Sequence, residues 1–367
     1  MVLIFFIGFL ASLLVSGLLV RRAKAHAGRY GYAKPQRFHV GDTPRLGGVA
    51  IFSGCACGWA AAVIAYFCGN LGWMYVDPVL ALKWVVVIFP AIAGGVQEDL
   101  TQRLAIRYRL LLTAFSALLA VLFVDVSIVR LGLPMLDALV VAAPWLALAL
   151  AMVAMAGLPH AFNIIDGYNG LAGMVALVVY VALTYVALQV GDRQLATVLL
   201  ALIGATVGFL FWNYPRGLLF AGDGGAYLWG LTIAVASLVL VKRHAMVSPW
   251  FPVLLLAYPV WETFFSIYRK LARGMSPSVA DALHFHQLIY RRIVRHVFSD
   301  DDSRRILMRN NRTSPYLWGF TMFTVVPAVL FWRNTLVLMV FTMLFVLLYV
   351  GCYLAIVRFK VPRWLRK

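Results

Sequence analysis

Long apolar runs, separated by short polar segments, dominate the chain. Eleven of them can cross a bilayer as helices: 2–20, 47–67, 78–96, 109–127, 136–158, 171–189, 195–211, 224–241, 249–269, 317–333 and 335–357. A hydrocarbon core about 30 Å thick needs roughly 20 apolar residues per helix, and unpaired backbone groups in lipid exclude open sheets. Membrane β-barrels use shorter, alternating segments. We therefore predict an all-α integral membrane protein with eleven spanning helices in one domain, residues 1–367.

Composition and charge support this prediction and orient the chain. Of the residues, 63% are hydrophobic and 13% are charged, and the mean hydropathy is +0.87. With the N-terminus outside, 26 of the 32 Lys and Arg residues lie in inner segments, 5 lie in outer segments and Lys83 lies within a span. Basic residues stay in the cytoplasm, so the C-terminus is predicted to be cytoplasmic. The net charge of +18 then faces anionic lipid and a polyanionic substrate. It accompanies no nucleic-acid-binding motif, which argues against that partner.

Carboxylates gather on the same inner face. Glu98 and Asp99 end the third run in GGVQEDL, Asp166 lies in NIIDGYNGLAG, and Asp223 lies in GDGG at the start of the eighth run. An acid at a helix end beside lipid is costly unless it pairs or binds a cation, although capping of a helix is the structural alternative. Together these acids predict a site for a hard cation such as Mg²⁺ and its phosphate ligands. Phosphoryl transfer is the chemistry that such a site supports.

The segment 270–316 is the only long stretch outside the predicted spans, and we predict that it is a cytoplasmic loop. It contains His284 and His286 in HFHQ, with Asp281 before them and Arg291 after them. If the segment is helical, the spacing of three places Asp281 and His284 on one face. Histidines near arginines favour a phosphate-binding role, although a lone histidine is more often structural.

Five motifs, in this order, resemble those of the polyprenyl-phosphate N-acetylhexosamine-1-phosphate transferase family. They are HVGDTPRLGG, GGVQEDL, NIIDGYNGLAG, GDGG and HFHQ, and they fall within residues 34–292. The resemblance implies a multi-pass enzyme of the bacterial inner membrane, with a periplasmic N-terminus and a cytoplasmic active site. Such enzymes transfer an N-acetylaminosugar 1-phosphate from a UDP-N-acetylhexosamine to undecaprenyl phosphate and release UMP. They begin the synthesis of lipid-linked cell-envelope polysaccharide and use Mg²⁺, with Mn²⁺ as the alternative.

The same resemblance implies roles for individual residues. The catalytic set is Glu98, Asp99 and Asp223, and the metal ligands are Asp223, Asp166 and Asp99. The substrate-binding set is His39, Arg45, Asn163, Asp166, Asn169, Asp281, His284, His286 and Arg291. Three positions depart from the family pattern: Glu98 replaces the first Asp of an Asp-Asp pair, Asn169 replaces a second acid, and Gln287 replaces a third His.

Other functions stay open at this stage. A phospho-N-acetylmuramoyl-pentapeptide transferase is one, although its relatives usually carry consecutive histidines where this chain has Gln287. A transporter would need charges near the bilayer midplane, for which Lys83 and Glu262 are the only candidates. An inactive scaffold is a third alternative, because of the three departures. The aminosugar, the choice between Glu98 and Asp99 as base and the existence of a homodimer are likewise open.

Overall fold

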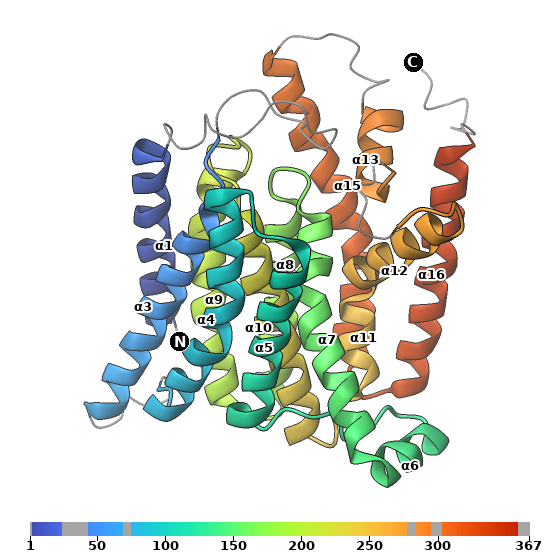
Figure 1. Cartoon of the computed structure of the whole chain (residues 1–367). Helices are drawn as coiled ribbons and strands as arrows, with labels where there is room; N and C mark the ends of the chain where they lie inside the picture. The colour runs from blue at the N-terminus through green and yellow to red at the C-terminus, as the bar shows by residue number, and fades with distance from the viewer. Residues whose placement is uncertain (1, 24–42, 69–74, 277–282, 295–302, 359–367) are drawn as a thin grey trace.

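The computed structural model describes residues 2–23, 43–68, 75–276, 283–294 and 303–358. Within these residues all regular structure is helical, as predicted, and nine helices are long and apolar enough to cross a membrane. These nine are α1 (Val2–Arg22), α3 (Gly47–Phe67), α4 (Pro78–Thr101), α5 (Ile106–Val124), α7 (Pro144–Ile165), α8 (Leu171–Gln189), α9 (Arg193–Asn213), α10 (Gly222–Arg243) and α16 (Thr335–Val357). Figure 1 shows them side by side in one bundle, so the chain is an integral membrane protein.

Several helix boundaries follow directly from the sequence pattern. The predicted spans 47–67, 171–189 and 335–357 coincide with α3, α8 and α16. At one end of the bundle, acidic or amide side chains cap the helices: Asp77 accepts a hydrogen bond from the Leu80 N–H at 3.0 Å, and Asp192 accepts one from the Leu195 N–H at 3.0 Å. Such caps satisfy backbone donors that a helix start leaves unpaired.

Proline divides two of the predicted runs. The run 136–158 becomes α6 (Pro134–Ala142) and α7, with the break at Ala143 directly before Pro144. The run 249–269 becomes α11 (Trp250–Leu255) and α12 (Ala257–Leu271), which Figure 1 shows inclined to the bundle. Residues before proline avoid the helical region, and proline itself offers no N–H to the preceding turn. Neither α11 nor α12 is therefore long enough to span a membrane alone.

The predicted loop 270–316 holds more helix than the sequence indicated. It contains α13 (Phe285–Ile289), the π-helical turn η1 (Tyr290–Val294) and the first half of α15 (Ser303–Leu330). The predicted span 317–333 is the second half of α15, whose first half is rich in polar residues. Consequently α11, α12 and α15 fall outside the nine candidate spans, and the expected count of eleven is not reached in the described part of the chain.

Helix α10 lies at the centre of the bundle and is almost completely buried. Glycines let its backbone touch its neighbours. A Cβ on Gly95 of α4 would lie 2.5 Å from the backbone nitrogen of Gly224, and one on Gly48 of α3 would lie 2.3 Å from that of Gly225. Small residues at such crossings allow close backbone approach in membranes. The N-terminus of α10 is therefore set against α3 and the end of α4.

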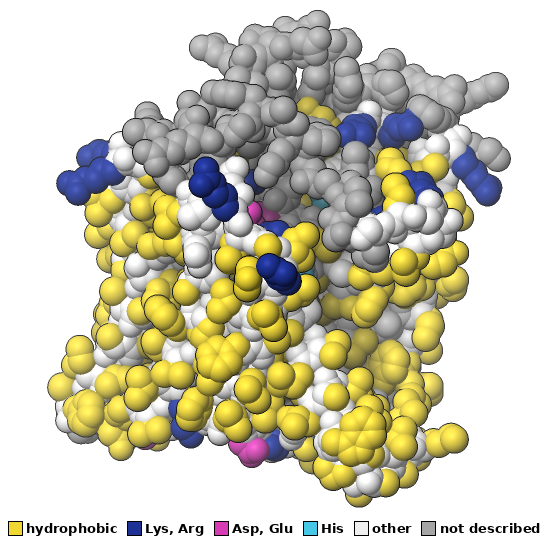
Figure 2. Space-filling view, viewed as in Figure 1, with side chains coloured by type: hydrophobic (Ala, Val, Ile, Leu, Met, Phe, Trp, Pro, Cys, Tyr) yellow, Lys and Arg dark blue, Asp and Glu magenta, His cyan; other side chains and the backbone are white. Residues whose placement is uncertain are grey.

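The helix ends that carry the sequence motifs lie together on one side of the bundle, which is uppermost in Figure 1. The Gly47 N–H donates to the Phe220 carbonyl at 2.8 Å, and the Gly48 N–H donates to the Ala221 carbonyl at 2.9 Å. These bonds hold the start of α3 beside the start of α10. Figure 2 shows Lys and Arg side chains gathered around this same end, above an apolar belt. The distribution is typical of a membrane protein with one strongly basic face.

Candidate active site

Side chains from two neighbouring helices hold the carboxylate of Asp223 in the first turn of α10. Its Oδ2 accepts a hydrogen bond at 2.7 Å from Nη1 of Arg109 on α5, and its Oδ1 accepts one at 2.8 Å from Nδ2 of Asn163 on α7. The Tyr227 hydroxyl, one turn along α10, donates to Oδ2 at 3.3 Å. The side chain of Asp223 keeps 15% of its surface exposed. This carboxylate is therefore fixed in place and still accessible.

Asp99, the second acid of the GGVQEDL pair, caps the helix that carries Asp223. Its Oδ1 accepts a hydrogen bond from the Asp223 N–H and its Oδ2 accepts one from the Gly224 N–H, both at 2.9 Å. A negative charge is favourable at a helix N-terminus, where these N–H groups have no partner within the helix. Gly222 makes the contact possible, because a Cβ there would lie 2.4 Å from an oxygen of Asp99. Asp99 thus orients Asp223.

Glu98 has a different environment from its neighbour. Its Oε2 accepts a hydrogen bond at 2.8 Å from the Leu104 N–H in the turn between α4 and α5. The side chain is only partly buried, and Oε1 accepts no hydrogen bond from the described residues. The two adjacent acids therefore have different positions. Asp99 points into the protein against α10, whereas Glu98 lies at the partly exposed edge of the site and keeps one oxygen available.

Asp166 lies directly after α7 and shares an electrostatic environment with Asp223. Burial raises the pKa of Asp166 to about 7, Arg45 opposes this shift, and the negative charge of Asp223 adds to it. In the described part of the chain, its carboxylate accepts no hydrogen bond. A buried acid without such support favours its protonated form unless a cation comes close. The charges of Asp166, Asp223 and Arg45 therefore lie close enough to interact.

The histidine motif meets the loop that follows α7. His284 is the residue before α13, so it is not within a helix, and its Nδ1 lies 2.9 Å from Oε1 of Glu262 on α12. The rings of His284 and His286 are parallel, with centroids 5.4 Å apart. Nε2 of His286 lies so near Gly167 that a Cβ there would be 2.8 Å away. The HFHQ and NIIDGYNGLAG motifs are thus in contact.

The basic residue after this motif is also near the loop. Arg291 lies in η1, next to Tyr290, whose ring stacks on that of Tyr168 at 5.4 Å. Its charge interacts with the phenol of Tyr168. His39 and Asp281, two further predicted substrate-binding residues, lie outside the described residues. The predicted helical face shared by Asp281 and His284 therefore includes a position outside the described residues, and His284 directly precedes α13.

Asn169 is buried and binds helix α15. Its N–H donates to Oδ1 of Asn310 at 2.8 Å, its Nδ2 donates to Oδ1 of Asn311 at 3.0 Å, and its carbonyl accepts from the Ser314 hydroxyl at 2.6 Å. All three partners belong to α15, whereas Asp223 is bound by α5, α7 and α10. The departure from an acid at this position therefore suits the amide-rich surface that the chain places against it.

Gln287, another departure from the family pattern, also has a structural partner. Its Oε1 accepts a hydrogen bond from the His284 N–H at 3.3 Å, within a capping arrangement at the start of α13. The amide helps to fix the backbone of His284.

Three important side chains were missed by the sequence prediction. The sequence analysis assigned no site role to Arg109 or Tyr227, and it considered Glu262 only as a feature of a transporter. A charged residue inside an apolar helix was the available signal for Arg109 and Glu262. No sequence pattern distinguished Tyr227 from the other aromatic residues of the bundle.

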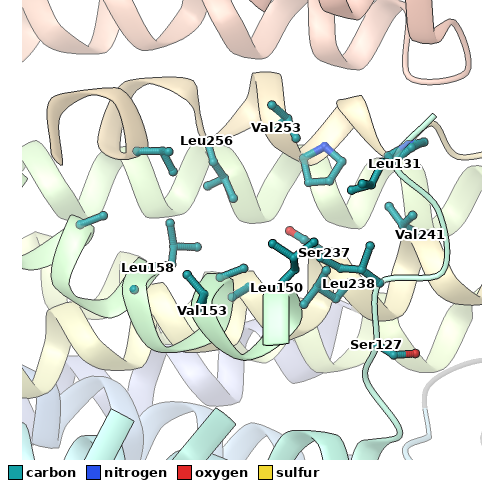
Figure 3. A pocket seen from close by; sticks show the side chains of 18 of the residues that line it. Ser127, Leu131, Leu150, Val153, Leu158, Ser237, Leu238, Val241, Val253 and Leu256 are labelled. Atoms are coloured by element: carbon teal, nitrogen blue, oxygen red, sulfur yellow. The ribbon is translucent and has the colours of Figure 1, made fainter. Parts of the chain in front are cut away.

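An apolar cavity of about 510 Å³ lies between α7, α10, α11 and α12. Figure 3 shows Leu150, Val153 and Leu158 on one side and Val253 and Leu256 on the other. The lining extends from the segment 127–131 at one end to residue 161 at the other, two positions before Asn163. Since Val153 is largely exposed, the cavity opens toward the lipid-facing surface. It is suited to an apolar chain whose head lies near Asp223.

Residues 81–241 match glycosyl transferase family 4. This range includes Asp99, Arg109, Asn163, Asp166 and Asp223, the residues that converge at the start of α10. This part of the chain is similar to glycosyl transferase family 4. The similarity supports the resemblance that the five motifs suggested.

Curated relatives extend the similarity beyond this range. The chain is 28% identical over 293 residues to a probable undecaprenyl-phosphate N-acetylglucosaminyl 1-phosphate transferase of Bacillus subtilis, which covers 78% of this chain and 76% of the relative. It is 26% identical to the undecaprenyl-phosphate alpha-N-acetylglucosaminyl 1-phosphate transferase of Escherichia coli K12, over 69% of this chain and 66% of that one. A decaprenyl-phosphate N-acetylglucosaminephosphotransferase of Mycolicibacterium smegmatis is 28% identical, over 73% and 70% respectively.

Proposed function

We propose that this protein transfers an N-acetylaminosugar 1-phosphate from a UDP-sugar to undecaprenyl phosphate and releases UMP. The observation that carries the proposal is the position of Asp223, which Arg109 and Asn163 hold at the start of α10 beside an apolar cavity. The names of the relatives make UDP-N-acetylglucosamine the first donor to test. We place the site on the cytoplasmic face of the bacterial inner membrane, because the basic residues gather at that end.

The acceptor is the substrate that the cavity fits. Its lining is formed by aliphatic and aromatic side chains, with few polar groups. A polyprenyl chain gains free energy by burying its surface there, at about 25 cal/mol per Å². Because the lining ends two residues before Asn163, a phosphate on such a chain would lie at the same end of the bundle as Asp223. A lipid acceptor therefore explains why a charged site adjoins an apolar cavity.

The donor carries a diphosphate, and positive groups lie around its expected position. Arg45 interacts with Asp166, Arg109 binds Asp223, and Arg291 lies beside Tyr168. Arginine suits phosphate recognition, since its planar guanidinium can donate two parallel hydrogen bonds. These groups would neutralise the charge that develops when the bond between the two phosphates breaks.

Magnesium fits the acids of this site. In the described residues, no three acidic, histidine or cysteine side chains form a ready-made cation site. Mg²⁺ usually binds one or two carboxylates and takes its other ligands from phosphates and water, which Asp223 and Asp166 could supply. Burial raises the pKa of Asp166 to about 7 although Arg45 opposes the shift, so a bound cation would further stabilise its carboxylate. When bound at these acids, the cation would supply positive charge that neutralises the donor phosphates.

The chemical step needs little beyond positioning. An oxygen of the lipid phosphate attacks the β-phosphorus of the UDP-sugar, the bond to the UMP phosphate breaks, and UMP leaves with those electrons. We assign Glu98 to the acceptor phosphate, because one of its oxygens is available at the partly exposed edge of the site. Asp99 instead holds the start of α10. This distribution supports Glu98 as the base.

The proposal is tested with purified protein, undecaprenyl phosphate and a panel of UDP-aminosugars that includes UDP-N-acetylmuramoyl-pentapeptide. UMP release is measured, and the lipid product is resolved by mass. We expect one UDP-N-acetylhexosamine to yield a polyprenyl diphosphate sugar, and Asp223→Asn to abolish this product while the protein stays folded. Equal rates for the Asp223→Asn variant and the wild type would refute the proposal.

The same assay separates the alternatives. Turnover of only the pentapeptide donor would indicate the peptidoglycan enzyme, and no turnover of any donor would favour a transporter or a scaffold. Exchange of labelled UMP into UDP-sugar without lipid would indicate a covalent enzyme intermediate in place of direct attack. We expect exchange only when undecaprenyl phosphate is present.

A further inference from the structure

Helix α12 carries its polar side chains inward and its apolar side chains outward. Four buried residues lie three or four positions apart on one face: Tyr258, Glu262, Ser266 and Arg269. The exposed residues of the same helix are Phe264, Tyr268 and Leu271. Amphipathic helices of soluble proteins have the opposite arrangement. The inward polar face therefore has partners inside the bundle that account for it.

Glu262 is the centre of this face, and no part of it reaches the surface. Its Oε1 lies 2.9 Å from Nδ1 of His284 and accepts a hydrogen bond from the Phe285 N–H at 3.2 Å. Its Oε2 accepts a hydrogen bond at 2.7 Å from the Tyr349 hydroxyl of α16. Three donors thus converge on one carboxylate. A fully buried carboxylate needs such donors, and His284 and Tyr349 are the two side chains in hydrogen-bond contact with it.

The contact with Glu262 determines which ring nitrogen of His284 is available for other interactions. Because a carboxylate only accepts hydrogen bonds, Nδ1 of His284 carries a proton and donates it to Glu262. Nε2 is then the remaining polar atom of the ring, and it makes no hydrogen bond to the described residues.

We propose that Glu262 is a positioning residue that orients the ring of His284, with its Nε2 available to the nucleotide sugar. This inference rests on the proposed function and adds a residue to it. The backbone of His284 is fixed as well, by the hydrogen bond to Gln287 and by the start of α13. Tyr349 anchors the far side of the Glu262 carboxylate and so connects α16 to the site.

His284 is connected to the loop that carries Asp166. Its ring stacks on that of His286, and Nε2 of His286 lies against Gly167, the residue after Asp166. A small rotation of the His284 ring would therefore disturb contacts at this loop. Glu262 thus orients a ring whose stacked neighbour, His286, lies against the loop that carries Asp166.

The test compares Glu262→Gln with the wild type. The glutamine keeps the shape and can accept the Nδ1–H hydrogen bond, but it removes the charge. We expect the KM for the UDP-sugar to rise by about 10- to 100-fold, as when residues that orient a functional histidine are changed, with a smaller effect on kcat. The Kd for UDP, measured by calorimetry without acceptor lipid, should rise in parallel. Tyr349→Phe is the matched control: it removes one hydrogen bond from Glu262 but keeps the contact between Glu262 and His284, and the KM should stay near that of the wild type.

A double-mutant cycle separates positioning from general destabilisation. If Glu262 acts through His284, then Glu262→Gln should add no further increase in KM to a His284→Gln protein. Additive effects, or an unchanged KM in Glu262→Gln, would overturn the inference. Should Glu262→Gln fail to fold, Glu262→Asp keeps the charge but shortens the side chain by one methylene. It should raise the KM only when His284 is present, and an equal rise in its absence would overturn the inference.

Failure of the proposed function gives a different result. In that case the wild type releases no UMP from any donor, whereas the UDP-binding measurement can still be made on every variant. A Kd for UDP that is equal in wild type and Glu262→Gln would overturn the positioning role regardless of turnover.

Discussion

Asp99 on α4 accepts a hydrogen bond of 2.9 Å from the backbone N–H of Asp223 on α10. The two acids are 124 residues apart in the chain, yet one caps the helix that presents the other. Glycines make the contact close, since Gly95 and Gly224 allow the two backbones to touch. Of the two adjacent acids, Asp99 therefore fixes the start of α10, whereas Glu98 lies at the partly exposed edge of the site.

This relationship predicts that isosteric substitutions of Asp99 and Asp223 affect different properties, stability for the first and activity for the second. Asp99→Asn loses one of two acceptors for backbone N–H groups, so we expect a loss of about 1–2 kcal/mol in the free energy of unfolding, as for other helix caps. Asp223→Asn removes an ion pair that is partly exposed, so its stability should change less, while UMP release is abolished. Melting temperature and UMP release are measured for both variants in the same detergent. An Asp99→Asn protein as stable as the wild type would contradict the capping role.

The contact between α4 and α10 predicts a strong effect of added volume. Gly95→Ala would place a Cβ 2.5 Å from the backbone of Gly224, which has no flexible side chain to move aside. We expect the free energy of unfolding to fall by about 1–3 kcal/mol, which is typical of overpacking. Activity should also fall, because Asp223 directly precedes Gly224.

The matched control for Gly95→Ala is Gly351→Ala on α16, where a Cβ would meet nothing within 4 Å. Alanine favours helix over glycine by about 1 kcal/mol, so this variant should melt at or above the wild-type temperature. Equal melting temperatures of Gly95→Ala and Gly351→Ala would show that the close contact does not limit stability.

The amides around Asn169 predict that the acid expected from the family pattern is harmful in this chain. Asn169→Asp would place a buried charge opposite Oδ1 of Asn311 and lose the hydrogen bond from Nδ2. We expect a loss of about 1–3 kcal/mol in stability, read from the melting temperature. Asn334→Asp is the control, because its side chain caps α16 at an accessible helix start, where an acid is favourable. An Asn169→Asp protein that melts with the wild type would contradict the docking role of Asn169.

The raised pKa of Asp166 predicts a pH dependence with a definite sign. Burial raises this pKa from 3.8 to about 7, so the folded protein binds the proton more tightly than the unfolded chain does. Between these values, stability therefore decreases as the pH rises. A Mg²⁺ ion near the carboxylate offsets the buried charge, so its stabilising effect should be larger about one unit above pH 7 than about one unit below it.

Thermal melting with and without Mg²⁺ at the two pH values measures this dependence. Asp166→Asn should remove most of the difference, since the amide does not ionise. A Mg²⁺-induced shift in melting temperature that is the same at both pH values in the wild type would contradict the prediction.

The membrane class and many helix limits could be predicted from the sequence, because the bilayer imposes a length and an apolar composition on every span. The breaks at Ala143 and Leu256 were harder to predict, since a proline near a helix start can either begin a helix or divide one. The first half of α15 was predicted as loop because its polar residues hide a helix whose buried face consists of Asn310, Thr313 and Ser314.

The candidate site, like the fold, could be predicted only in part from the sequence. The residue types at the inner helix ends indicated phosphate and cation chemistry before any fold was known, because acids beside lipid are costly without a function. Their partners depended on how the helices pack: Asp223 meets Arg109 across 114 residues, Glu262 meets His284 from a separate helix, and Asn169 meets Asn310 across 141. Local pattern carries information over one or two turns of a helix. Contacts between distant helices arise from the close packing of the whole bundle, which no single segment encodes.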